Sequence, residues 1–169
     1  DEEAGRTIPV CDENGAVWWQ ADMDIDCDGV RTAQCNEDTD CCFYPDTAFH
    51  TSTDEPLNAA ELPFVVVPSP CDIWDYRQFG VHGGGAVAII YDDRVKYAVV
   101  GDTGPTGIIG EASYAAAADL GIDPDPSTGG TDSGVTYIFF KNSTVAPIED
   151  HNEAISTGQA LARQFVDNN

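Results

Sequence analysis

One segment of the sequence has a carboxylate near each end and almost no bulk between them. Residues 101–113 have the sequence GDTGPTGIIGEAS, with Asp102 and Glu111 on either side of three glycines. Two carboxyl groups facing one bond can hydrolyse a glycosidic linkage, because one donates a proton to the leaving oxygen while the other activates water. Glycines would let a polymer approach the backbone closely. The segment is therefore a candidate hydrolytic site.

Other interpretations of the same segment are weaker or remain open. A phosphate loop would need the lysine of G-x-x-x-x-G-K-[ST], and the glycine spacing does not fit the dinucleotide pattern G-x-G-x-x-G. A purely structural interpretation is open for both acids. Glu111 would then be an acid at a helix N-terminus, and Asp102 a turn residue bonded to its own backbone.

A second acidic motif, ADMDIDCDG, alternates carboxylates with other residues. Its acids are Asp22, Asp24, Asp26 and Asp28. On a strand they would share one face, and their mutual repulsion would be relieved by a cation or by ammonium groups of a ligand. The spacing partly fits a calcium loop, but position twelve would be Cys35 rather than glutamate, and no helical patterns flank it. Solvated carboxylates that protect a strand edge are the plain alternative.

Aromatic residues next to this motif are candidates for stacking on a sugar ring. Alternation along 18–28 puts Trp18 on the face of the aspartates and Trp19 on the other face. Trp18 is therefore the better candidate for a ligand contact, and Trp19 for the core. The histidines are too scattered for a metal site, and we predict neither a metal nor a cofactor.

The charge balance restricts the possible partners. Seven basic and 30 acidic residues give a formal net charge of −23. Such a chain repels phosphates, which argues against nucleic acid and anionic membranes as partners. A field of one sign concentrates ligands of the opposite charge, although solubility alone also accounts for an acidic surface. No apolar run is long enough to span a bilayer.

Six cysteines lie in the first 71 residues, namely Cys11, Cys27, Cys35, Cys41, Cys42 and Cys71. The even number and the lack of paired zinc-ligand spacings favour three disulfides, with the pairing left open. We expect an arm over 1–15 held by Cys11, and an irregular excursion over 27–62 stapled by disulfides. The start at DEEAG is typical of a mature N-terminus, so we expect a secreted, extracellular protein.

The length and the hydrophobic pattern predict one domain over 1–169, mainly β with one or two helices. Strands are expected over 16–26, 62–69 and 135–140, with a hairpin over 85–102 that turns at Asp92-Asp93. A helix is expected after Glu111, ending at Gly121, and a second over 148–169.

Four segments together resemble the chitosanases of glycoside hydrolase family 75, known from fungi and actinobacteria. They are MDIDCDG (23–29), PFVVVPS (63–69), the hairpin with its glycine loop (86–113), and TYIFFKNSTVAP (136–147). The resemblance implies endo-acting, inverting cleavage of β-1,4-linked glucosamine chains on a single-domain β-barrel of the double-psi type. The family's catalytic pair maps onto Asp102, as general base, and Glu111, as general acid. Residues 30–60 depart from the family in being rich in cysteine.

With this resemblance the acidic surface has a specific substrate, because chitosan is a polycation where it dissolves. Asp26 and Asp28 lie inside a matching segment and are predicted to bind sugar ammonium groups. Further predicted substrate contacts are Asp24, Asp22, Trp18 and Thr103. We expect a monomer. Two alternatives are a non-catalytic acidic carbohydrate-binding module on the same barrel and a calcium-stabilised secreted protein.

Overall fold

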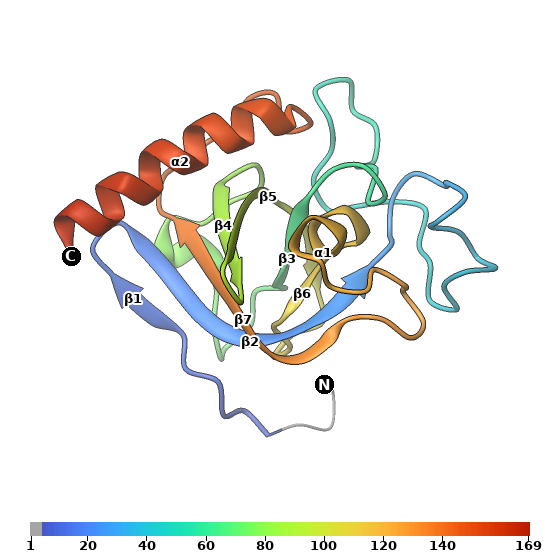
Figure 1. Cartoon of the computed structure of the whole chain (residues 1–169), viewed down its shortest axis with the longest axis horizontal. Coiled ribbons are helices and arrows are strands. Elements are labelled where there is room, and N and C mark those ends of the chain that lie inside the picture. Colours follow the sequence, from blue (N-terminus) through green and yellow to red (C-terminus); the bar gives the residue numbers. More distant parts are fainter. Residues whose placement is uncertain (1–4) are drawn as a thin grey trace.

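The computed structural model describes residues 5–169, so the first four residues of the predicted arm lie outside it. The strands are β1 (Cys11–Glu13), β2 (Ala16–Asp26), β3 (Phe64–Pro68), β4 (Ala86–Tyr91), β5 (Arg94–Gly104), β6 (Glu111–Ser113) and β7 (Thr131–Phe140). Two α-helices, α1 (Tyr114–Leu120) and α2 (His151–Asn168), and one 3-10 turn, η1 (Tyr76–Phe79), complete the elements (Figure 1).

Six of the strands close into a barrel. The sheet order is β1-β2-β6-β3-β5-β4-β7, and an additional pairing of β2 with β7 joins the two ends of the six-stranded part. β2 runs parallel to β6 and β3 parallel to β5, whereas the other pairs are antiparallel. The prediction of a mainly β barrel with two helices is confirmed, and the closer assignment to the double-psi type stays a prediction.

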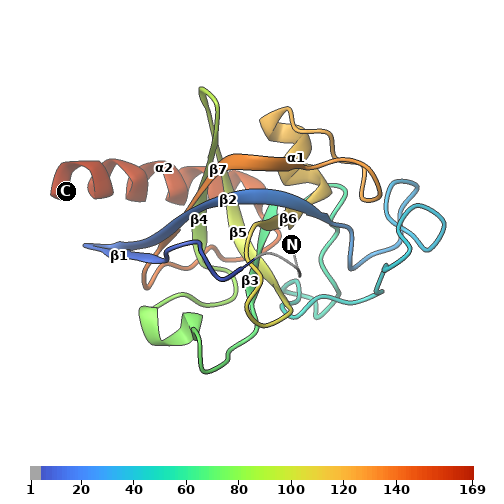
Figure 2. The same ribbon diagram turned by 90° about the horizontal axis from the view of Figure 1, so that it is seen from below.

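Alternation along the strands separates an apolar interior from an outer face. Trp19, Val65, Val67 and Phe139 belong to the cluster of buried side chains that fills the barrel. Val66 points the other way, into a second cluster that includes Leu57. α2 packs against β4 and β5, and the excursion over 27–62 lies beside α1, away from the C-terminal end of α2 (Figures 1 and 2). No helix of the described residues is long and apolar enough to cross a membrane.

The segment after the glycine loop differs from the prediction. Glu111 does not begin the helix, because it lies in β6, and the N-cap of α1 is Ser113, whose hydroxyl accepts the Ala116 N–H. The helix ends at Gly121 as predicted, with φ 75°. A strand of three residues carries too little periodicity to be recognised in the sequence, which is why β6 was missed.

The disulfide prediction is only partly confirmed. Cys27 and Cys35 form a disulfide within the excursion, across a Cα–Cα distance of 5.0 Å. The prediction of three disulfides is wrong for this structure, in which the other four cysteines are free, namely Cys11, Cys41, Cys42 and Cys71. Counting cysteines does not reveal which pairs approach closely enough to bond.

Candidate active site

The two candidate catalytic acids lie on either side of one residue of β3. Val66 pairs with Asp102 of β5 on one side and with Glu111 of β6 on the other. Paired residues on neighbouring strands point to the same face, so both carboxyl groups lie on the outer face of the barrel. Two strand spacings put their Cα atoms roughly 9.6 Å apart.

The glycine loop produces this arrangement by crossing the end of β3. It leaves β5 at Gly104, whose carbonyl accepts hydrogen bonds from the N–H and the hydroxyl of Ser69, the residue after β3. It then enters β6 at Glu111, on the other side of β3. A Cβ on Gly104 would come within 3.1 Å of Glu111 Oε2, so the glycine leaves room for that carboxyl group.

Asp102 is held by three hydrogen bonds and is almost inaccessible, with 6% of its surface exposed. Its Oδ1 accepts the N–H groups of Ala48 and Thr103, both at 2.8 Å. The side chain of Asp26 provides the third: one of its oxygens lies within 4.8 Å of an oxygen of Asp102, and it lowers the pKa of Asp102 as a hydrogen-bond donor does. A carboxylate with several donors is stabilised in its ionised form and has a fixed orientation.

The acids at the end of β2 reach the same place. Asp26 is 4% exposed, and its Oδ1 accepts the Asp28 N–H at 2.7 Å. Asp28 is half-buried, and its Oδ1 accepts the N–H of Tyr44 at 2.7 Å. The excursion over 27–62 therefore supplies backbone donors to this acidic cluster through Tyr44 and Ala48. We define the acidic cluster as Asp26, Asp28, Asp102 and Glu111.

Burial and mutual repulsion shift the pKa values in the cluster. Desolvation, followed by the charges of Asp102 and Asp24, raises the pKa of Glu111 to about 7. Desolvation raises the pKa of Asp28 to about 6, against the opposing effect of the Tyr44 N–H. The pKa of Asp26 lies well above its usual range, first because of burial and then because of Glu111 and Asp102.

Asp102 differs from its neighbours because its hydrogen bonds oppose the effect of burial. Desolvation still raises its pKa above the usual value for an aspartate, but the N–H groups of Ala48 and Thr103 and the side chain of Asp26 offset part of that rise. Among residues 5–169 no hydrogen bond of this kind reaches the Glu111 carboxyl group. Glu111 also lies outside the α1 N-terminus, so the helix dipole does not favour its ionised form as the sequence suggested. The site thus contains one carboxyl group suited to staying protonated and one suited to ionising.

A cation is another ligand that this spacing allows. Oxygens of Asp26, Asp28 and Asp102 all lie within 4.8 Å of one another. Each of the three, however, already accepts a backbone N–H on Oδ1. Asp24, the first acid of the calcium-loop pattern, is exposed and outside this group. The cluster therefore does not have the ligand set of that pattern.

The remaining predicted contacts lie at varying distances from the cluster. Asp24 is exposed and pairs with Glu111 across β2 and β6. Thr103 pairs with Val67, so its side chain points to the face opposite Asp102, and only its N–H reaches that carboxylate. Trp18 is half-buried and pairs with Ile138, roughly 26 Å along the strand from Asp26.

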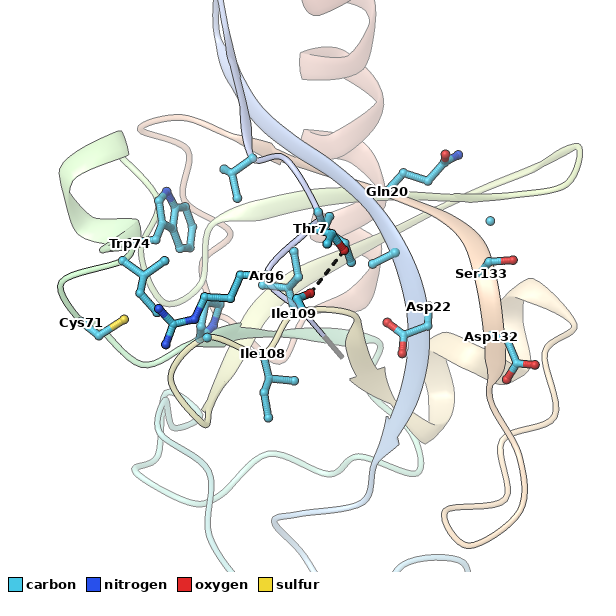
Figure 3. Close-up of a pocket in the computed structure, with 18 residues that line it drawn as sticks. Arg6, Thr7, Gln20, Asp22, Cys71, Trp74, Ile108, Ile109, Asp132 and Ser133 are labelled. Carbon is cyan, nitrogen blue, oxygen red and sulfur yellow. Dashed lines mark hydrogen bonds between the residues drawn. The ribbon is translucent and has the colours of Figure 1, made fainter. Parts of the chain in front are cut away.

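Asp22 belongs to a separate pocket of about 500 Å³ on the other side of the glycine loop (Figure 3). The pocket lies between the segment 5–10, the loop residues Ile108 and Ile109, and Trp74. Burial, then the charge of Asp24, raises the pKa of Asp22. The structure therefore separates Asp22 from Asp26, although the two share one alternating motif.

Sequence reasoning missed the residues that support the acids. Tyr44 and Ala48 act through their backbone N–H groups, and Gly104 through its lack of a side chain. Sequence reasoning also missed Asp46, whose charge opposes the ionisation of Asp102. Backbone donors from an irregular loop leave no signal in residue type. Only Gly104, inside the segment 101–113, belonged to a motif that the sequence singled out.

Comparison with known proteins establishes the family of the chain. Residues 23–165 match the family model described as "Fungal chitosanase of glycosyl hydrolase group 75". The chain belongs to this family. It is 28% identical over 160 residues to Endo-chitosanase C of Aspergillus oryzae, covering 92% of this chain and 37% of the relative. It is 30% identical over 147 residues to an Endo-chitosanase of Aspergillus oryzae, covering 80% of this chain and 59% of the relative.

The chain thus spans 37% and 59% of the length of these two relatives. The family match includes all four members of the acidic cluster, and the glycine loop between Asp102 and Glu111. It also includes the excursion that supplies the Tyr44 and Ala48 donors.

Proposed function

We propose that this chain is an endo-acting chitosanase that hydrolyses β-1,4 bonds between glucosamine units with inversion. The observation that carries the proposal is the contrast between two carboxyl groups on either side of Val66. Glu111 has a pKa of about 7 because it is desolvated among acids, and Asp102 accepts three hydrogen bonds that favour its ionised form. Membership of family 75 supports the substrate class.

In the proposed mechanism Glu111 is the general acid. At the mildly acidic pH where chitosan dissolves, a carboxyl group with a pKa near 7 is protonated and donates to the leaving glycosidic oxygen. Asp102 is the general base, taking a proton from a water that attacks the anomeric carbon from the opposite face. The bond to the leaving oxygen breaks as the bond to water forms, which inverts the configuration.

The spacing of the two acids supports inversion. Inverting enzymes hold their carboxyl groups roughly 6.5–9.5 Å apart to leave room for the water, whereas a retaining pair is only about 5 Å apart. Residues separated by one complete strand have Cα atoms roughly 9.6 Å apart, which suits the wider arrangement.

The acidic surface is proposed to recognise the charge of the substrate. The net charge of −23 attracts a polycation, and Asp24 and Asp28 are the accessible acids next to Glu111 and Asp102. We propose Asp22, Trp18 and Thr103 as contacts further from the cleaved bond. We further propose that the protein is secreted and monomeric and that it binds neither nucleic acid nor membranes.

The test is to incubate soluble chitosan with the purified protein and to follow its cleavage over time. We expect new reducing ends together with a rapid fall in viscosity, because an endo-acting enzyme cuts within the polymer. Proton NMR of fresh products should show the α-anomer first. A β-anomer would contradict inversion, and binding of chitosan without new reducing ends would identify a carbohydrate-binding module instead. Loss of stability with a chelator would favour the calcium-stabilised alternative.

A further inference from the structure

The acidic cluster contains a carboxyl group that neither step of the proposed mechanism uses. Asp26 lies at the end of β2 and is 4% exposed. A sugar ammonium group would have little of its surface to contact. Its contacts are instead internal, with the backbone N–H of Asp28 and the carboxylate of Asp102. This burial is hard to reconcile with the role of substrate ligand that the sequence suggested.

We propose that Asp26 is a positioning residue that donates a hydrogen bond to Asp102 and so fixes the carboxylate that activates water. This inference rests on the proposed function of Asp102 as the general base. It gives Asp26 no contact with substrate, and it predicts that any neutral side chain with a donor in the same place can substitute for it.

The hydrogen-bond pattern sets the direction of this contact. Oδ1 of Asp26 accepts the Asp28 N–H, which leaves Oδ2 to carry a proton. Asp102 already receives the N–H groups of Ala48 and Thr103 on Oδ1 and has no proton to give when it is ionised. Two buried carboxylates in contact cannot both ionise, so the proton stays on the partner with fewer donors.

The surroundings agree with Asp26 as the protonated partner. Glu111 and Asp28 face Asp26 and disfavour a negative charge on it, in addition to its burial. The charge of Asp46 likewise disfavours a negative charge on Asp102, but the three hydrogen bonds to Asp102 oppose this effect. Asp26 thus turns a potential repulsion beside the general base into a third donor to it.

The experiment compares Asp26→Ala with Asp26→Asn on a soluble glucosamine oligosaccharide. Asparagine keeps an oxygen for the Asp28 N–H and offers an amide N–H to Asp102, whereas alanine offers neither. We expect Asp26→Ala to lower kcat about 100-fold with little change in KM, as for loss of an orienting group. Asp26→Asn should remain within about 10-fold of the wild type. Asp93→Asn, an exposed acid in the turn between β4 and β5, is the control for loss of charge.

The pH profile separates positioning from a merely structural role. Without its donor Asp102 takes up a proton more readily, so the acidic limb of the kcat profile should move to higher pH in Asp26→Ala. It should stay near the wild-type position in Asp26→Asn. Adding Asp26→Ala to Asp102→Asn should cause no further loss of kcat, because the effects of two residues that act through each other are not additive.

Each other result overturns the inference. Equal losses in both variants with a raised KM would make Asp26 a substrate ligand, and an unchanged kcat in Asp26→Ala would leave it no role. If Asp26→Ala does not fold, the Asp26→Asn profile and carboxyl NMR of the wild type decide. There Asp26 should titrate above the ordinary pH range of an aspartate, and its ionisation within or below that range would contradict the proposal. A wild type inactive on every chitosan substrate overturns the proposed function itself, which is a distinguishable result.

Discussion

β3 separates two regions of this barrel that have opposite physical characters. Val65 and Val67 point into an interior filled by aromatic and aliphatic side chains, whereas Val66 points outwards between Asp102 and Glu111. The interior gains stability by removing apolar surface from water. The outer face buries carboxyl groups next to one another, which disfavours their ionised forms.

The comparison indicates that the chemistry is confined to the outer face around Val66, whereas stability comes mainly from the interior and from the second buried cluster elsewhere on the outer face. Interior substitutions should change the free energy of unfolding and leave the reaction intact. Substitutions in the acidic cluster should do the reverse, because buried like charges destabilise the folded chain while serving the reaction. The excursion makes this possible, since its N–H groups hold Asp28 and Asp102 in place.

The sharpest test of this division is to neutralise each catalytic acid. Asp102→Asn and Glu111→Gln should each lower kcat by about 10²–10⁴-fold, the usual contribution of a general base or acid. The melting temperature should stay the same or rise, because one member of a repelling group is removed. Asp93→Asn should change neither quantity. Retained activity in the double variant would remove both acids from the chemistry.

The matching test on the interior uses Trp19, which is fully buried and packs against Phe139 with ring centroids 4.4 Å apart. Trp19→Ala should reduce the free energy of unfolding by about 3–5 kcal/mol, through lost burial and the cavity left behind. Trp19→Phe should reduce it much less, since the indole N–H has no hydrogen-bond partner among the described residues. Denaturant titration measures both.

The kcat of the folded fraction should be unchanged in both Trp19 variants. A large fall in kcat in a folded Trp19→Phe protein would contradict the division between the two faces.

The acidic cluster should also give stability an unusual dependence on pH. Glu111 has a pKa of about 7 in the folded chain against an ordinary value of 4.5. Between these values the unfolded chain has lost a proton that the folded chain keeps, so stability falls as pH rises. For Glu111 alone the fall is at most about 3 kcal/mol. Asp28, with a pKa of about 6, acts in the same direction.

Denaturant titrations between pH 4.5 and 7.5 measure this slope. Carboxylates whose pKa is lowered, such as Glu37 beside Arg31, are already ionised in that range. Glu111→Gln should make the slope shallower, and Asp93→Asn should not. Stability that rises over this range would show that the acidic cluster is not destabilised by its own charge.

Much of the barrel could be predicted from the sequence because its strands are long and alternate clearly. β2 has the predicted bounds, the β4–β5 hairpin turns at Asp92 as expected, and Trp19 lies in the core. Residue types and glycine spacing made Asp102 and Glu111 a candidate pair, and their catalytic role stays a prediction. Their placement on either side of Val66 could not be predicted, because it depends on β3 lying between the strands that carry them.

The predictions that failed concern elements and side chains whose positions depend on contacts distant in sequence. β6 is too short to show a period and exists because β2 and β3 lie on either side of it. The alternation over 22–28 predicted one shared face for all four acids. Asp26 and Asp28 do lie together, but Asp22 lines a different pocket. The donors from Tyr44 and Ala48 come from a loop without any repeating pattern.

The smallest expected effect comes from Gly104, the point where the outer face meets the loop. Its φ is not in the left-handed region, so alanine fits the backbone there. The added Cβ would lie 3.1 Å from Glu111 Oε2 and 3.2 Å from Val66 Cγ1, so the carboxyl group must move by a few tenths of an ångström. Gly104→Ala should therefore lower kcat about 10-fold, because small displacements of a catalytic group weaken proton transfer.

The free energy of unfolding should change little in Gly104→Ala, since the displaced group is the end of a flexible side chain on a face that contributes chemistry rather than packing. The suitable control is Gly107→Ala in the same loop. There φ is +80°, and an added Cβ comes no closer than 3.4 Å to Ile73. That variant should lose about 1 kcal/mol of stability from backbone strain, with kcat of the folded protein retained. If Gly104→Ala instead lost stability and kept its kcat, the outer face of β5 at this residue would serve packing rather than chemistry. The contrast between the interior and the outer face would then fail at Gly104.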